Sequence, residues 1–247
     1  MNQTNNLTRE KMLELIDEFH QLYQTRPIKD NNGGMKSGHM FPSWFVIKIL
    51  QPKYIIESGV WKGLGTWFFE KASPNSKIIS IDPNPNFRVY TSEKVDYRTT
   101  DFTLNSWNDI DIEDTLVFLD DHQNSLERIK FAKQVGFKHI MVEDNYPYNQ
   151  GDCYTPKKIL SQKNYVIDLA GNRTWYDTKS EDYEYFTKTV TKYIEFPPLF
   201  KDDKTRWGDE WINENYETPE QLLLDTEKYK DFFDERKDYT WICYLEL

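Results

Sequence analysis

Apolar residues follow two different spacings along the chain. Between residues 8 and 23, Leu, Met, Ile and Phe recur every three or four positions, which predicts an amphipathic N-terminal helix. From residue 53 onwards, short and nearly continuous apolar runs alternate with helical patterns. They predict strands at 53–60, 77–83, 95–102, 114–121 and 138–145, and helices at 63–72, 124–136 and 154–162. This alternation predicts a parallel sheet with helices on both faces, the doubly wound, Rossmann-like α/β fold.

The two ends of the chain are patterned differently from this core. The Gly- and Asn-rich stretch 29–44 predicts a loop, and 45–50 adds a short helix before Pro52. A capping box that begins at Thr218 predicts a helix at 219–234, and 239–247 predicts a closing strand. The segment 196–211 between them is expected to cover one end of the sheet. We therefore expect a single domain with three parts: a helical cap and loop (1–50), a Rossmann-like core (51–195), and a C-terminal insertion with its helix and strand (196–247).

Composition narrows the class of protein. A formal net charge of −10 and a pI near 5.0 argue against a surface that binds nucleic acid. Only Cys153 and Cys243 are present, which argues against a disulfide framework and a structural zinc site and favours the cytoplasm. No stretch is long and apolar enough to span a membrane, so we expect a protein without a membrane partner. A homo-oligomer stays open.

Acidic residues follow nearly every predicted strand. Glu57, Asp82 and Asp101 end the first three strands; Asp120 and Asp121 end the fourth; Glu143, Asp144 and Asn145 end the fifth. Because ligands of open α/β sheets bind outside the carboxyl ends of the strands, these side chains are expected to meet at one edge. Solvated surface acids or a polar turn are the alternative interpretation.

The first strand is followed by a glycine-rich loop. In "IIESGVWKGLGT" the glycines are Gly59, Gly63 and Gly65, and this spacing departs from the G-x-G-x-x-G of dinucleotide-binding loops. Asp82, which ends the next strand, stands where a carboxylate accepts both hydroxyls of an adenosine ribose. The loop therefore predicts a nucleoside-type ligand other than a dinucleotide. Tight packing of the strand on the following helix is the alternative.

Four of these elements together resemble the class I S-adenosylmethionine-dependent O-methyltransferases over about residues 33–160. "GVWKG" is similar to the first motif of macrocin-type sugar O-methyltransferases, and "IISIDPNP" to the second motif. "VFLDDH", "VEDNY" and "GGMKSG" resemble stretches of the catechol group. The resemblance implies that Glu57, Gly59 and Gly63 line the methionine end of the cofactor, that Asp82 binds the ribose, and that Asp101 lies near the adenine. Lys36, in "GGMKSG", and Asp120 are implied to contact the cofactor as well.

The resemblance also implies a divalent metal, such as Mg²⁺, held by Asp120, Asp144 and Asn145, with Glu143 as an alternative ligand. Physical chemistry agrees: neighbouring strands lie about 4.8 Å apart, and hard cations prefer oxygen ligands. The ligand register stays open between Asp120 and Asp121.

The base is also open. His122 is a candidate because its ordinary pKa lies near neutral pH, and strand alternation would put it on the face of Asp120; Asp121 is a second candidate. His39 and Lys36 are either site residues or bystanders in a loop.

The function expected from these residues is transfer of the cofactor's methyl group to a hydroxyl of a small molecule. The "GVWKG" match favours a sugar or glycoside over a catechol-like acceptor. Two alternatives stay open: a nicotinamide-dependent oxidoreductase, which the glycine spacing disfavours, and a non-catalytic protein that keeps the fold.

Overall fold

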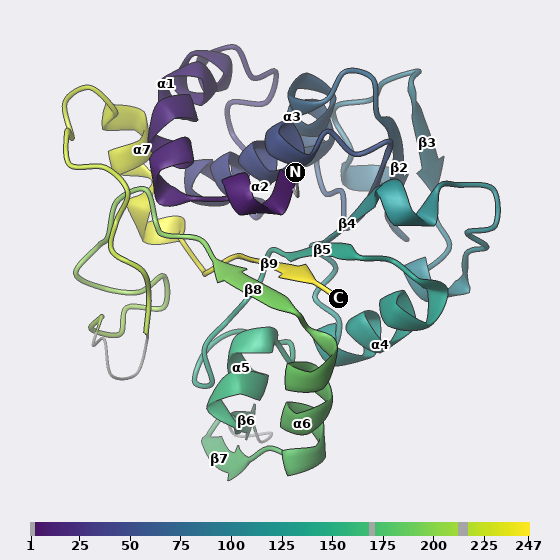
Figure 1. Ribbon diagram of the computed structural model, residues 1–247. Helices are drawn as coiled ribbons and strands as arrows, with labels where there is room; N and C mark the ends of the chain where they lie inside the picture. Colours follow the sequence, from purple (N-terminus) through teal and green to yellow (C-terminus); the bar gives the residue numbers. More distant parts are fainter. Residues whose placement is uncertain (1–2, 168–170, 212–216) are drawn as a thin grey trace.

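A seven-stranded sheet forms the centre of the computed structural model, which describes residues 3–167, 171–211 and 217–247 (Figure 1). The strand order is β3-β2-β1-β4-β5-β9-β8, and the first five strands are parallel. β9 runs antiparallel to both of its neighbours. The strands are β1 (Tyr54–Ser58), β2 (Lys77–Ile81), β3 (Val95–Arg98), β4 (Thr115–Leu119), β5 (His139–Val142), β8 (Lys192–Glu195) and β9 (Cys243–Glu246).

Helices cover both faces of this sheet, which confirms the predicted doubly wound fold. Figure 1 shows α1, α2, α3 and α7 on one side and α4, α5 and α6 on the other. Their bounds are α1 (Arg9–Gln24), α2 (Ser37–Leu50), α3 (Leu64–Ala72), α4 (Ser125–Val135), α5 (Pro156–Ser161), α6 (Ser180–Thr189) and α7 (Lys230–Asp234). Short 3₁₀ turns lie at Gln3–Asn6, Pro85–Phe87, Phe102–Leu104, Ile112–Asp114 and Arg236–Asp238.

The central strands are apolar on both faces because each face packs under helices. In β4, Leu116 and Phe118 join the core under α1, α2 and α3, whereas Val117 and Leu119 join the core on the α4 side. Alternate side chains of a strand point to opposite faces, so a strand covered on both sides needs a continuous apolar run. The run 115–119 therefore reads as the most buried part of the sheet.

Helix α2 is a correction to the predicted loop at 29–44. It begins at Ser37, and its N-terminus is capped from a distant segment, because the Ser37 backbone N–H donates to Glu235 Oε2 at 2.9 Å. Ser37 and nearly all side chains from His39 to Ile47 are buried. Tertiary burial and a remote capping carboxylate outweigh the Gly/Ser composition and Pro42, which disfavour a helix locally.

The predicted helix at 219–234 is also wrong over most of its length, since α7 spans only Lys230–Asp234. The Thr218 hydroxyl accepts a hydrogen bond from Trp241 Nε1 at 2.7 Å. The backbone N–H groups of Leu222 and Leu223 donate to the carbonyls of Pro198 and Leu199. These long-range bonds replace the local bonds of the expected first turns.

Four elements lie where the sequence pattern predicted none. A two-stranded antiparallel sheet is formed by β6 (Lys163–Ile167) and β7 (Arg173–Asp177), and α6 and β8 follow. The last predicted strand is present as β9, which inserts between β5 and β8. Among the described residues, no helix combines the length and the apolar character that a bilayer crossing requires.

Candidate active site

The strand order reverses between β1 and β4, and the two strand ends are locked together there. The Asp120 backbone N–H donates to the Ser58 carbonyl at 2.7 Å. Gly59 has φ +95°, and a Cβ at this position would lie 1.9 Å from the Asp120 carbonyl oxygen. Gly59 is therefore required both by its backbone conformation and by the close approach of β4. Crevices at such a switch point are the usual ligand sites of doubly wound sheets.

Two cavities open at this edge and share Gly33, Gly34, Asp120 and His122. We call the first, of about 330 Å³, the glycine-loop cavity. It is lined by Gly33, Gly34, Ser58, Gly59, Val60, Trp61, Ile81, Asp82, Pro83, Asp101, Asp120, Asp121, His122, Gln123 and Arg128. We call the second, of about 380 Å³, the acidic cavity, and its lining includes Asp120, Glu143, Asp144, Asp152 and Asp238.

Asp82 holds the loop that follows β1. Its Oδ2 accepts hydrogen bonds from the backbone N–H groups of Val60 (3.2 Å) and Trp61 (3.1 Å), and its Oδ1 accepts one from Asn84 (2.8 Å). The carboxylate thus lines the glycine-loop cavity in an orientation fixed by three backbone donors. This arrangement suits the recognition of neighbouring hydroxyl groups.

An arginine joins the next two acids of the same cavity. Arg128 donates to both oxygens of Asp101 (2.8 and 2.6 Å) and lies 2.9 Å from Asp121 Oδ2. Its hydrogen bonds to Asp101 hold the pKa of that carboxyl well below the ordinary range. Asp121 also accepts from the Ser58 hydroxyl at 2.7 Å. Asp101 is thereby held as an anion at the wall, and Asp121, proposed above as a base, is turned to Arg128.

Three residues expected to contact the cofactor lie elsewhere. Glu57 is 1% exposed and accepts from the hydroxyls of Thr66 (2.5 Å) and Ser80 (2.6 Å), because its side chain points from β1 toward α3. Burial raises its pKa to about 7. Gly63 caps α3 with φ +86° beneath the Tyr90 carbonyl, a packing role. Lys36 lines the acidic cavity instead.

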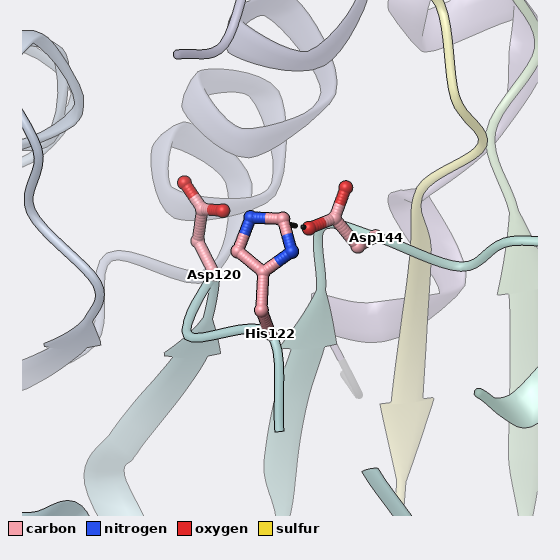
Figure 2. Close-up of side chains that lie close together, drawn as sticks. All are labelled: Asp120, His122 and Asp144. Carbon is pink, nitrogen blue, oxygen red and sulfur yellow. Dashed lines mark ion pairs between the residues drawn. The ribbon is translucent and has the colours of Figure 1, made fainter. Parts of the chain in front are cut away.

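Asp120, His122 and Asp144 form a compact group in the acidic cavity (Figure 2). One potential ligand atom from each lies within 4.8 Å of those of the other two. The His122 ring stands between the two carboxylates, with Nε2 3.3 Å from Asp144 Oδ2. Strand alternation is not the reason for this proximity, since β4 ends at Leu119; the chain turns at His122, which has φ +53°.

The charges in this group are strongly coupled. Burial, and then the charge of Asp144, raise the pKa of Asp120 well above its ordinary value. His122 Nδ1 lies 3.1 Å from Asp152, and this hydrogen bond, with the charge of Asp144, raises the pKa of His122 to about 9. Asp144 Oδ2 is buried and accepts no hydrogen bond. A buried carboxylate oxygen that accepts no hydrogen bond, beside a second acid and an imidazole, fits a divalent cation.

The other two predicted metal ligands differ from each other. Glu143 lines the acidic cavity and is 5% exposed, whereas the Asn145 amide is used elsewhere. Asn145 Nδ2 donates to the Tyr193 hydroxyl at 2.8 Å, and its Oδ1 accepts from the Lys157 backbone at 2.9 Å. Glu143 therefore stays a candidate ligand, and Asn145 does not.

His39 is a residue of the site that sequence reasoning left undecided. It lies in α2, is 2% exposed, and its Nε2 accepts from the Thr240 backbone N–H at 2.9 Å. The proton therefore sits on Nδ1, which contacts Glu143 Oε1. Burial lowers the pKa of His39 to about 4, so the ring is neutral at pH 7. His39 orients Glu143 at the cavity wall.

Aromatic and basic residues complete the acidic cavity and were not predicted. Tyr146, Tyr165, Arg206 and Trp207 line it, and the rings of Tyr146 and Trp207 meet edge to face at 5.5 Å. Arg206 and Trp207 belong to the segment 196–211, which was expected to cover an end of the sheet. The aromatic and basic residues of "KTRWGDEW" were the only signal for them.

Neither a protein-family model nor a curated protein matches the chain. Among solved structures, it is similar to the Podospora anserina methyltransferase PaMTH1 bound to S-adenosylhomocysteine, at 14% identity over 51% of this chain and 61% of that chain (TM-score 0.38). It is also similar to CmcI with magnesium and S-adenosylmethionine, at 18% identity over 48% and 58% (TM-score 0.39). A third is the O-methyltransferase TomG from Streptomyces achromogenes with S-adenosylmethionine, at 11% identity over 95% and 89% (TM-score 0.46).

PaMTH1 and TomG are methyltransferases by name. This chain spans about three fifths of the length of PaMTH1 and of CmcI. At such identities and TM-scores the likeness is one of fold at most, so the function below is argued from the residues of the two cavities.

Proposed function

We propose that this chain is a single-domain O-methyltransferase that moves the sulfonium methyl group of S-adenosylmethionine to a hydroxyl oxygen of a small molecule, with a divalent cation as assistant. One observation carries the proposal: the glycine-loop cavity and the acidic cavity meet at Asp120 and His122. A cofactor in the first cavity and an acceptor in the second would face each other at this junction. Positioning two reactants in this way removes much of the entropic barrier to transfer.

The glycine-loop cavity would hold the cofactor. Asp82, oriented by three backbone donors, would accept the ribose hydroxyls, and Gly59 leaves the floor free of a side chain. The ion pair of Asp101 with Arg128 forms one wall of the cavity. Glu57 and Gly63 would then act indirectly, by packing beneath the glycine-rich loop that follows β1 and not by contacting the cofactor.

The acidic cavity would hold the cation between Asp120, Asp144 and His122, with Glu143 as a neighbour oriented by His39. The donor set of two carboxylates and an imidazole suits Mn²⁺ better than Mg²⁺, because imidazole is a softer ligand than carboxylate. When bound, such a cation would act as a Lewis acid that lowers the pKa of an acceptor hydroxyl. His122 keeps its proton up to about pH 9 without an ion and would have to lose it to act as a ligand or base.

The acceptor that fits this cavity best is a sugar or glycoside. Polar rings of this kind bind through carboxylates that accept their hydroxyls and through aromatic faces, here Tyr146, Tyr165 and Trp207. Adjacent hydroxyls would supply the two oxygens for chelation.

Calorimetry with S-adenosylhomocysteine, with and without Mg²⁺, tests the cofactor side first, and we expect a dissociation constant in the micromolar range in both conditions. A screen of sugars, glycosides and catechols for release of S-adenosylhomocysteine then tests transfer. NADH serves as the control ligand. Binding of NADH in place of the methyl donor, or binding without transfer to any class of hydroxyl, would contradict the proposal.

A further inference from the structure

Two basic side chains line the acidic cavity without an ion pair among the described residues. They are Lys36, at the N-terminus of α2, and Arg206. Three of the acids of the cavity contact histidines instead: Glu143 contacts His39, and both Asp144 and Asp152 lie against His122. Lys36 and Arg206 thus line the cavity without a direct ion pair to a described side chain, although the charge of Arg206 acts on Glu143.

Arg206 is displayed by a tight and well-anchored turn. The Thr205 backbone N–H donates to the Asp209 carbonyl at 2.8 Å, and that of Gly208 donates to the Thr205 carbonyl at 2.9 Å. Lys204 and Glu210 form an antiparallel bridge at the base of the turn. The turn therefore has a defined backbone, although Arg206 itself is exposed.

The turn is also fastened to the cavity wall. The Gln150 amide donates to the Asp209 carboxylate, and the indole of Trp207 packs edge to face on Tyr146, with an interplanar angle of 74°. Arg206 and Trp207 are consequently held at the mouth of the cavity that contains Asp120, His122 and Asp144, although both are exposed.

We propose that the acidic cavity selects an acceptor whose hydroxylated ring carries an anionic group, with Arg206 and Lys36 binding the anion and Trp207 and Tyr146 contacting the ring. This inference rests on the proposed function, because it names the substrate class of the same cavity. The guanidinium fork of arginine matches the oxygens of a carboxylate or a phosphate, and both sources present this shared chemistry.

The positions of the charges give such an acceptor one orientation. An anion is repelled from the carboxylates of Asp120, Glu143 and Asp144 and attracted to Arg206, so the hydroxyls are left to face the acidic group. Complementary charges between a cavity and its ligand help to fix the register of the ligand. Neutral sugars would lack this orienting force.

Binding assays with matched probe pairs test the inference without requiring turnover. The protein is saturated with S-adenosylhomocysteine and Mg²⁺, and the affinities of glucuronate, glucose 6-phosphate and glucose are compared by calorimetry and by quenching of tryptophan fluorescence. We expect at least one anionic probe to bind tenfold or more tightly than glucose, and the carboxylate and phosphate arms identify which anion is preferred. Arg206→Gln should remove the preference, Arg206→Lys should keep part of it, and Lys36→Gln should reduce it.

Lys204→Gln is the matched control, because Lys204 is a cation on the same turn that does not line the cavity. It should leave the preference unchanged. Equal affinity for charged and neutral probes, no measurable binding of either anion, or a preference that survives in Arg206→Gln would each overturn the inference. If the protein methylates neutral acceptors and shows no preference for anions, the inference is wrong and the proposed function stands. If it binds anions but transfers methyl groups to no acceptor, the proposed function is wrong and the anion site stands.

Discussion

The glycine-loop cavity is built mainly from strand ends in the first half of the chain, and its charges are satisfied within the protein. Asp82 accepts from three backbone N–H groups, and Asp101 is paired with Arg128. The acidic cavity gathers segments as far apart as His39 and Thr240, and its acids face one another. Asp144 Oδ2 is buried there without a donor.

The two cavities therefore differ in whether their charged groups are already paired before a ligand binds. A site with satisfied charges is preorganised for its ligand, whereas clustered carboxylates raise one another's pKa values until a cation arrives. We therefore expect cofactor binding to be independent of metal and acceptor chemistry to depend on it.

The largest effect is expected from Asp144→Asn. Loss of a cation that contributes several kcal/mol should lower the rate of methyl transfer by about 100- to 1,000-fold. Affinity for S-adenosylhomocysteine, measured by calorimetry, should stay within about twofold of the unmodified protein, or about 0.4 kcal/mol. Asp238→Asn, in the same cavity but outside the group, is the control. Full turnover of Asp144→Asn in the presence of a chelator would remove the metal from the account.

Gly59→Ala should damage the glycine-loop cavity through the backbone. The new Cβ would meet the Asp120 carbonyl oxygen at 1.9 Å, in addition to the cost of φ +95°. Gly208→Ala measures the cost of the positive φ alone, because Gly208 has φ +87° and nothing lies within 4 Å of the added Cβ. Denaturant unfolding should show a loss of about 1–3 kcal/mol for Gly208→Ala and a larger loss for Gly59→Ala. Equal losses would mean that the strand ends are less tightly joined than described.

Asp82→Ala should weaken the binding of S-adenosylhomocysteine at least about tenfold, which corresponds to about 1.4 kcal/mol. The variant loses both the proposed contact to the ribose and the acceptor that holds Val60 and Trp61. Asp96→Ala, an exposed acid of β3, is the control and should bind normally. Unchanged affinity in Asp82→Ala would place the ribose elsewhere.

Glu57→Gln should change the pH dependence of stability rather than ligand binding. Burial raises the folded-state pKa from 4.5 to about 7, so the folded protein binds a proton that the unfolded chain releases. The contribution of this carboxyl to stability is thus complete below pH 4.5 and is lost as pH rises through about 7. Unfolding measured across this range should be less pH-dependent in Glu57→Gln than in the unmodified protein. Glu113→Gln, at the surface, is the control, and an identical slope in all three proteins would contradict the assignment.

The sequence predicted the glycine-loop cavity better than the acidic cavity, because its residues follow neighbouring strands. Nearly continuous apolar runs and helical spacing predicted β1 to β5 and α4, because each of these patterns acts within a few residues. The meeting of the acidic side chains at one edge of the sheet was predictable because the carboxyl ends of parallel strands lie at the same edge. Glu57 was misplaced because one position of strand register decides which face a side chain takes.

The acidic cavity depends on contacts that no local pattern contains. His39 enters it because Glu235 caps α2 from near the C-terminus, and Arg206 enters through a turn anchored to Gln150. Thr218 is a good helix cap by sequence but accepts from Trp241 instead. Such partners are separated by many residues, so neither propensity nor spacing could have predicted them.

The central claim is that a cofactor and a cation occupy two different cavities that meet at Asp120. A crystal structure of the protein soaked with S-adenosylhomocysteine and Mn²⁺, with the ion located by its anomalous scattering, tests this most directly. We predict the nucleoside beside Gly59 and Asp82, and the ion within coordination distance of Asp120 and Asp144, with His122 turned to it. An ion bound elsewhere, or a nucleoside in the acidic cavity, would contradict the account.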